Sequence, residues 1–198
     1  MLYSSDEQLG GLWSAALETQ AMAGDDNLRN LRDAERTGEL AASLMRETDG
    51  ARIGMIEWDG WDTHANQRGA FNRQATALDT FLGSYRAGMG AAWSKTLVLV
   101  VTEFGRTVRF NGTNGSDHGT ASAALLLGGP VKGGQVLADW PGLREQDLYQ
   151  TRDLRPTIPL EAVLSGAIAE HFTLDPALTL NTLFPERQIE AMSNLVSA

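Results

Sequence analysis

The stretch Lys95–Thr102 (KTLVLVVT) is a continuous apolar run rich in valine. Such a run is typical of a strand in a parallel sheet, because helices cover both faces of the sheet and both sides of the strand must be apolar. The preceding residues 67–92 carry an apolar stripe at helical spacing, which predicts a long helix. Before that helix, Arg52–Trp58 (RIGMIEW) is predicted to be a strand. Strand, crossover helix and strand form a βαβ unit, so the predicted fold class is α/β with a mainly parallel sheet and flanking helices.

Local signals predict three more helices and one further strand. Ser5–Gln8 has the pattern of a capping box, which predicts a helix to about Met22. The other segments are a helix over residues 33–47 with Leu40 and Leu44 buried, a third apolar run at Ala123–Leu127, and a last helix that follows Pro159 and ends near Phe172. We expect a single domain over residues 1–198, with a helical segment at 1–50 and the α/β portion at 51–198.

The composition excludes several classes of function. The chain has 25 Asp and Glu against 16 Lys and Arg and no cluster of basic residues, which argues against nucleic acid as a partner. No apolar stretch is long enough for a membrane-spanning helix, so no membrane insertion is expected. Cysteine is absent, which excludes disulfides and thiolate ligands. A metal site would therefore have to use carboxylates and some of the three histidines.

Two polar clusters follow the predicted strands, at the position where open parallel sheets bind ligands. The first contains Asp59, Asp62 and His64, and the second contains Glu103, Arg106, Asp117 and His118. Histidine combined with carboxylates suits zinc, manganese or iron. We therefore predict a divalent metal site, with zinc or manganese favoured, and a small anionic substrate. The predicted ligands are Asp62, His64, Glu103, Asp117 and His118, and Arg106 is the predicted catalytic residue that binds the anion.

Two simpler interpretations of these clusters stay open. Asp-x-His and Asp-His are short patterns that occur by chance, and aspartate in loops often caps turns. Glu103 and Arg106 are also spaced for a local salt bridge. In these interpretations the polar residues only form a network that stabilises the strand ends.

Three motifs in order resemble one bacterial family. The segment Gly60–His64 with Asn66 and Gln67, the segment Glu103–Thr107 (EFGRT), and the segment Thr113–Ala121 (TNGSDHGTA) are similar to motifs of the family known as domain of unknown function 1501. The resemblance covers most of the chain from about residue 50 onward, and Gly128–Gly134 and Leu183–Pro185 also fit it.

The resemblance implies an alkaline-phosphatase-like and sulfatase-like fold that binds metals at the strand ends. By position, His64 with Asp62 or Asp59 corresponds to one ligand set and His118 to the last histidine. A further pair would fall at Glu103 and Phe104, and phenylalanine cannot bind a metal, so the chain departs from a two-metal site.

The implied activity is metal-dependent hydrolysis of phosphate or sulfate esters. A non-catalytic exported protein that retains the fold and acts in binding or structure is the alternative. The resemblance also implies a periplasmic or secreted location. Because family members are longer, we expect this chain to be the C-terminal part of a longer protein with an incomplete sheet. Such a sheet would expose apolar edges, which predicts either a homo-oligomer or a missing N-terminal segment.

Overall fold

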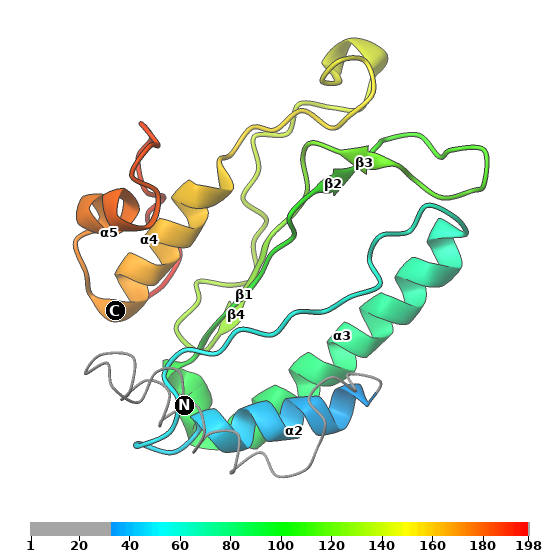
Figure 1. The fold of residues 1–198 in the computed structure, drawn as a ribbon. Helices are drawn as coiled ribbons and strands as arrows, with labels where there is room; N and C mark the ends of the chain where they lie inside the picture. Colours follow the sequence, from blue (N-terminus) through cyan, green and yellow to red (C-terminus); the bar gives the residue numbers. More distant parts are fainter. Residues whose placement is uncertain (1–32, 198) are drawn as a thin grey trace, which may run out of the picture. The chain divides into compact units, whose positions relative to one another are not determined.

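A computed structural model of the chain describes residues 33–197, which form helices and short antiparallel strands (Figure 1). The mixture of helix and strand that the sequence predicts is therefore present. These residues divide into two compact units, one made of residues 33–61 and 72–92 and the other of residues 62–71 and 93–197. The predicted helix from Ser5 to Met22 lies outside the described residues. Within residues 33–197, no helix is both long and apolar enough to cross a membrane.

The first unit contains helix α2 (Ala34–Met45) and most of helix α3 (Gln67–Met89). Helix α2 begins where predicted, because the carboxylate of Asp33 caps it by accepting a hydrogen bond from the Arg36 N–H at 3.1 Å. Its packing differs from the prediction: Leu40 and Leu44 are only half-buried. The buried residues of α2 are small ones, namely Ala34, Gly38 and Ala42.

A close approach between α2 and α3 explains why small residues are buried there. A Cβ at Gly38 would lie 2.0 Å from Ser84 Oγ and 2.5 Å from the Phe81 carbonyl oxygen, so only glycine fits. On α3 the buried residues are Phe81, Tyr85 and Met89, whereas Phe71, which the apolar stripe includes, is exposed. The stripe therefore predicted the helix correctly and its buried face only in part.

The segment Arg52–Trp58 does not form the predicted strand. Its apolar side chains are largely exposed, with Ile53 at 79% and Met55 at 95%. A strand needs a neighbouring strand for its backbone hydrogen bonds, and this segment has no such partner among the described residues. The predicted βαβ unit is therefore absent from residues 33–197.

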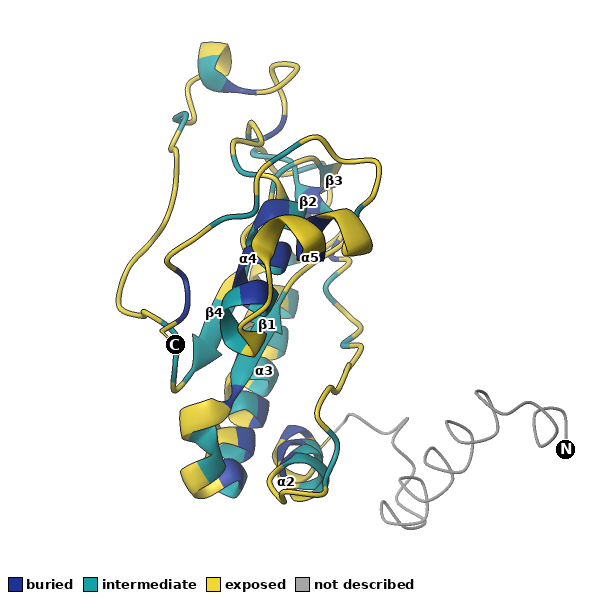
Figure 2. Ribbon diagram, turned by 90° about the vertical axis from the view of Figure 1, so that its left-hand side faces the viewer, coloured by how far each residue is buried: buried dark blue, intermediate teal, exposed yellow. Residues whose placement is uncertain are grey.

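The second unit contains two small antiparallel sheets. Strand β1 (Leu97–Val100) pairs with β4 (Leu125–Gly128), and between them in the chain β2 (Gly105–Arg106) pairs with β3 (His118–Gly119). The apolar run at 95–102 does contain a strand, but the pairing is not parallel. The reason is that the chain reverses direction in the loop between β2 and β3 and returns beside itself. All four residues of β1 are half-buried, in contrast to the full burial predicted (Figure 2).

Helix α4 (Leu160–Phe172) follows Pro159 as predicted and packs against α5 (Pro176–Leu183), which the sequence analysis did not predict. Two short 3-10 helices, η1 (Gly90–Lys95) and η2 (Glu145–Asp147), complete the elements. Leu195 and Val196 of the C-terminal segment pack with Ala167 of α4 in the core of this unit. Partly buried side chains of β1 and β4, namely Leu97, Leu99 and Leu126, pack against that core. The same unit carries the polar cluster described next.

Candidate metal centre

Asp62, His64 and His118 come together in the second unit, although the histidines are 54 positions apart. Each offers one ligand atom, and these atoms all lie within 4.8 Å of one another. The Asp62 Oδ1 atom lies 3.0 Å from His64 Nε2 and 2.9 Å from His118 Nε2. Within the described part of the chain, this is the group of His, Asp and Glu side chains close enough together that it could hold an ion.

The β2–β3 pair positions one side of the cluster. Arg106 of β2 lies directly opposite His118 of β3, so the two side chains are cross-strand neighbours. The backbones approach so closely here that glycine is required next to Arg106 and next to His118. A Cβ at Gly105 would lie 1.8 Å from the Ala121 carbonyl oxygen, and a Cβ at Gly119 would lie 2.5 Å from the Arg106 carbonyl oxygen. In these two pairs, Gly105 and Gly119 allow the strands to approach, and Arg106 and His118 provide side chains of the site.

A half-buried glutamine joins the two loops that carry the histidines. The Oε1 atom of Gln67 accepts hydrogen bonds from Thr63 Oγ1 at 2.6 Å and from Ser116 Oγ at 2.8 Å. Thr63 and Ser116 are 6% and 3% exposed, so these bonds lie in a protected environment. Thr63 directly precedes His64, and Ser116 directly precedes Asp117. The two hydrogen bonds therefore hold the backbone from which the His64 and Asp117 side chains extend.

The electrostatics of the cluster centre on Asp62. The hydrogen bond with His118, followed by the one from Arg106, holds the pKa of the Asp62 carboxyl below its ordinary value, although burial acts in the opposite direction. The carboxylate is therefore ionised at neutral pH, the form that binds a metal. The side chains of Asp62, His64 and His118 are all about half exposed, at 53%, 50% and 53%.

Arg106 lies against this carboxylate and is the most enclosed charged group of the site, with 19% of its side chain exposed. Its Nη2 donates to Asp62 Oδ1 at 2.7 Å and its Nη1 donates to the Ser116 carbonyl at 2.8 Å. The guanidinium also lies 5.1 Å from the centre of the Phe104 ring. Phe104 in turn stacks on His118, with ring centres 4.1 Å apart and an interplanar angle of 17°.

The other predicted site residues have different surroundings. Asp117 is not in the cluster around Asp62, because its Oδ1 lies 3.0 Å from His64 Nδ1, on the opposite edge of that ring. Glu103 is exposed and outside the cluster. Asp59 belongs to the other compact unit.

Sequence reasoning missed two residues that support the histidines. Phe104 cannot bind a metal, yet it supports the site by stacking on His118. Asn111 has no predicted role, yet its side chain bonds both Asp117 and the backbone of His64. The run of Gly and Asn after residue 110 indicates a turn built by side-chain to backbone hydrogen bonds, and that signal pointed to Asn111.

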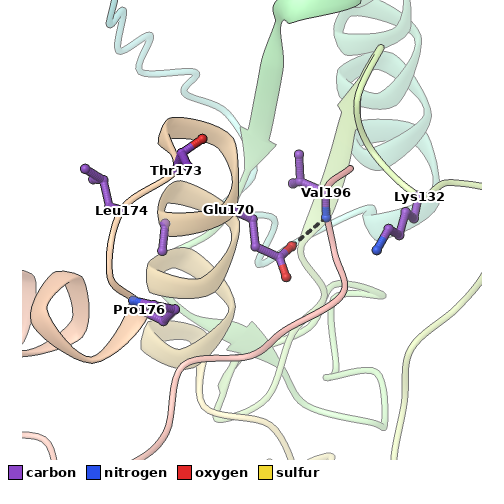
Figure 3. A pocket seen from close by; sticks show the side chains of 7 residues that line it. Lys132, Glu170, Thr173, Leu174, Pro176 and Val196 are labelled. Atoms are coloured by element: carbon purple, nitrogen blue, oxygen red, sulfur yellow. Dashed lines mark hydrogen bonds between the residues drawn. The ribbon is translucent and has the colours of Figure 1, made fainter. Parts of the chain in front are cut away.

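A concave surface lies elsewhere in the second unit. A pocket of about 400 Å³ is lined by residues of α4, α5 and the C-terminal segment together with Lys132 (Figure 3). The Glu170 carboxylate in it is bonded to the backbone, at 2.7 Å from the Val196 N–H. Asp62, His64 and His118 do not line this pocket, so the polar cluster is not part of it.

The fold and the site define a protein of helices and short antiparallel strands with an exposed cluster of two histidines and one aspartate. The chain belongs to the family described as "Protein of unknown function (DUF1501)", whose model matches residues 4–184. The match begins well before residue 50, so the family relationship extends further toward the N-terminus than the three motifs indicated. No curated protein and no solved structure matches the chain.

Proposed function

We propose that the chain binds one divalent metal ion through Asp62, His64 and His118 and uses it to hydrolyse a phosphate or sulfate ester. The observation that carries this proposal is the convergence of two imidazole Nε2 atoms on one carboxylate oxygen, at 2.9 and 3.0 Å. Two ligand atoms that each lie about 2.1 Å from a tetrahedral zinc ion are about 3.4 Å apart. Small side-chain movements would therefore bring the three groups to ligand distances.

The donor set favours zinc or manganese. Two imidazoles and one carboxylate are typical of catalytic zinc sites, which keep an open position, and the same set also holds manganese or iron. The number of ions follows from Phe104, which stacks on His118 at the position where a second ligand pair would fall. We therefore propose one ion rather than two. When bound, a divalent ion supplies Lewis-acid chemistry to an ester oxygen or to water.

Arg106 is the proposed anion-binding residue. Its guanidinium already bonds the Asp62 carboxylate at 2.7 Å, so it has a planar fork fixed next to the proposed metal position. A small anionic ester bound beside Asp62 would meet this positive charge. In the proposed function, Arg106 both holds Asp62 in place and orients the substrate.

The superfamily and the cellular location of this chain are proposed from the motifs alone. We propose that the family and this chain belong to the alkaline-phosphatase-like and sulfatase-like superfamily and act outside the cytoplasm. The motifs Gly60–His64, Glu103–Thr107 and Thr113–Ala121 support this placement, since they supply the Asp62, Arg106 and His118 side chains that converge in the site.

A second candidate is a metal-binding protein without turnover. It is favoured by the exposure of the site, because about half of each proposed ligand side chain is in contact with solvent. Water in an open site weakens the electrostatic stabilisation on which catalysis depends. In this alternative the ion would organise the loops instead of acting on a substrate.

Metal content and turnover separate these candidates. We expect the full chain, purified without chelator, to carry about one divalent zinc or manganese ion. His64→Ala and His118→Ala should abolish this binding, whereas His171→Ala, which removes the histidine of α4, should leave it unchanged. A panel of aryl phosphates and aryl sulfates then tests activity. Turnover that His118→Ala abolishes supports the hydrolase, and bound metal without turnover supports the second candidate. Equal metal content in all four proteins would refute both.

A further inference from the structure

The two ring nitrogens of His64 face two different carboxylates. Nε2 lies 3.0 Å from Asp62 Oδ1, toward the proposed metal position, and Nδ1 lies 3.0 Å from Asp117 Oδ1. A neutral imidazole carries one proton, so it can donate to only one of these oxygens. Which nitrogen is protonated decides whether Nε2 has a free lone pair for a metal.

The surrounding donors favour the proton on Nδ1. Asp62 Oδ1 already accepts a hydrogen bond from Arg106 at 2.7 Å, and His118 Nε2 also lies 2.9 Å from it. Asp117 Oδ1 accepts one other side-chain hydrogen bond, from Asn111 Nδ2 at 3.0 Å. The Asp117 oxygen is thus the less saturated acceptor, and it attracts the remaining proton of His64.

Asn111 fixes the Asp117 carboxylate relative to His64. Its Nδ2 donates to Asp117 Oδ1 and also to the His64 carbonyl oxygen, both at 3.0 Å. Its Oδ1 accepts from the N–H groups of Thr113 at 3.1 Å and Gly115 at 2.9 Å. The Asn111 amide therefore links the loop backbone to both Asp117 and His64. The hydrogen bond from Asn111, followed by the one with His64, holds the pKa of the Asp117 carboxyl below its ordinary value, against the effect of burial.

We propose that Asp117 and Asn111 are positioning residues for His64: Asp117 holds the neutral ring with its proton on Nδ1, and Asn111 holds Asp117. The consequence is that the lone pair of His64 Nε2 faces the same point as His118 Nε2. This assigns Asp117 a role next to the site in place of the ligand role that the sequence indicated. The consequence for metal affinity rests on the proposed function, but the position of the proton does not.

The proton position is measured directly in the metal-free protein. Long-range ¹H–¹⁵N spectra of the ¹⁵N-labelled full chain, dialysed against chelator, distinguish a protonated ring nitrogen from an unprotonated one. At about pH 8.5, well above the pKa of histidine in model peptides, we expect the ring proton of His64 on Nδ1. Asp117→Ala should shift the proton to Nε2, and Asp117→Asn, which keeps an oxygen acceptor, should retain it on Nδ1. A wild-type ring protonated on Nε2, or an Ala variant with an unchanged spectrum, would overturn the proposal.

Zinc affinity, measured by competition with a chromophoric chelator, tests the consequence. Asp117→Ala and Asn111→Ala are each expected to weaken Zn²⁺ binding by about 10- to 100-fold, the range found when such outer partners of a ligand are removed. The matched control is Asp139→Ala, an exposed loop aspartate outside the cluster. Affinity that stays within about twofold in both variants, while His64→Ala abolishes binding, overturns the positioning role and leaves the metal site intact. If the wild-type chain binds no Zn²⁺, the proposed function fails, and the spectra alone decide the positioning role.

Discussion

Glu170 of α4 is expected to anchor the C-terminal segment of the second unit, and replacing it by glutamine tests this. Its carboxylate accepts three backbone hydrogen bonds, from the N–H groups of Asn194, Leu195 at 2.8 Å and Val196 at 2.7 Å. Figure 3 shows the bond to Val196. Leu195 and Val196 are each 4% exposed and belong to the core. The anchor therefore holds core side chains in place through their own backbone.

The magnitude follows from the number and kind of these bonds. A glutamine keeps one carbonyl oxygen, but its NH₂ group faces a backbone donor, so at least one charge-assisted bond is lost and one N–H is left without a partner. Each such loss is worth about 1–3 kcal/mol. Since Glu170 is half-buried, we expect Glu170→Gln to lower the free energy of unfolding by about 2 kcal/mol. Glu186→Gln, the same change at an exposed position, should cost less than about 0.5 kcal/mol.

Two measurements check this expectation. Urea denaturation followed by circular dichroism gives the difference in unfolding free energy between the variants. Hydrogen exchange gives the local effect, and a loss of about 2 kcal/mol should speed exchange at the Leu195 and Val196 amides by about 30-fold. Equal stability of the Glu170 and Glu186 variants, with unchanged exchange at these amides, would refute the anchoring role.

The effect should also depend on pH in one direction. Burial opposes ionisation of Glu170, but the backbone N–H groups of Val196, Asn194 and Leu195 outweigh it and lower its pKa below the ordinary 4.5. A carboxyl whose pKa is lowered on folding contributes stability above its unfolded-state pKa and loses it as the pH falls through the folded-state pKa. The stability difference between wild type and Glu170→Gln should thus be constant from about pH 6 to pH 8 and shrink below about pH 4.5.

Three further substitutions, each measured by urea denaturation, test the packing. Gly38→Ala should destabilise the chain by about 1–3 kcal/mol, because the new Cβ would lie 2.0 Å from Ser84 Oγ. Gly83→Ala should stabilise it by about 0.5–1 kcal/mol, since this position in α3 has nothing within 4 Å of the new Cβ and alanine favours helix. Equal effects at the two glycines would contradict the close approach of the helices. Asp153→Asn should lower the free energy of unfolding by about 1–3 kcal/mol, because the Asp153 carboxylate accepts hydrogen bonds from Arg152 and Thr120 and the residue is only 1% exposed. A loss below about 0.5 kcal/mol would contradict a stabilising role of these hydrogen bonds.

The helices were predictable because their signals are local. Asp33 caps α2, and Pro159 precedes α4 at the position where a missing N–H costs nothing. Helix α5 was missed although Asp175 caps it and Pro176 occupies its first turn. Helix α5 has only eight residues, of which only Thr179 and Leu180 are buried, so it is too short to show an apolar stripe over several turns like the one that indicated α3.

Strand pairing was not predictable from the same apolar runs. A run such as Lys95–Thr102 indicates burial, and burial is equally possible in parallel and antiparallel sheets. The direction of pairing is set by how the chain returns, and here the short β2–β3 hairpin between β1 and β4 makes it antiparallel. Arg52–Trp58 has the composition of a strand, but composition cannot supply the neighbouring backbone that a strand requires.

The site shows most clearly where local patterns stop being informative. Asp62 with His64, and Asp117 with His118, read as two independent pairs in the sequence. In the structure each aspartate bonds the histidine of the other loop: Asp117 bonds His64 at 3.0 Å and Asp62 bonds His118 at 2.9 Å. Neither loop has its histidine oriented by its own residues alone. The two motifs therefore act as one unit, and a substitution of either aspartate should disturb the histidine that lies more than fifty residues away.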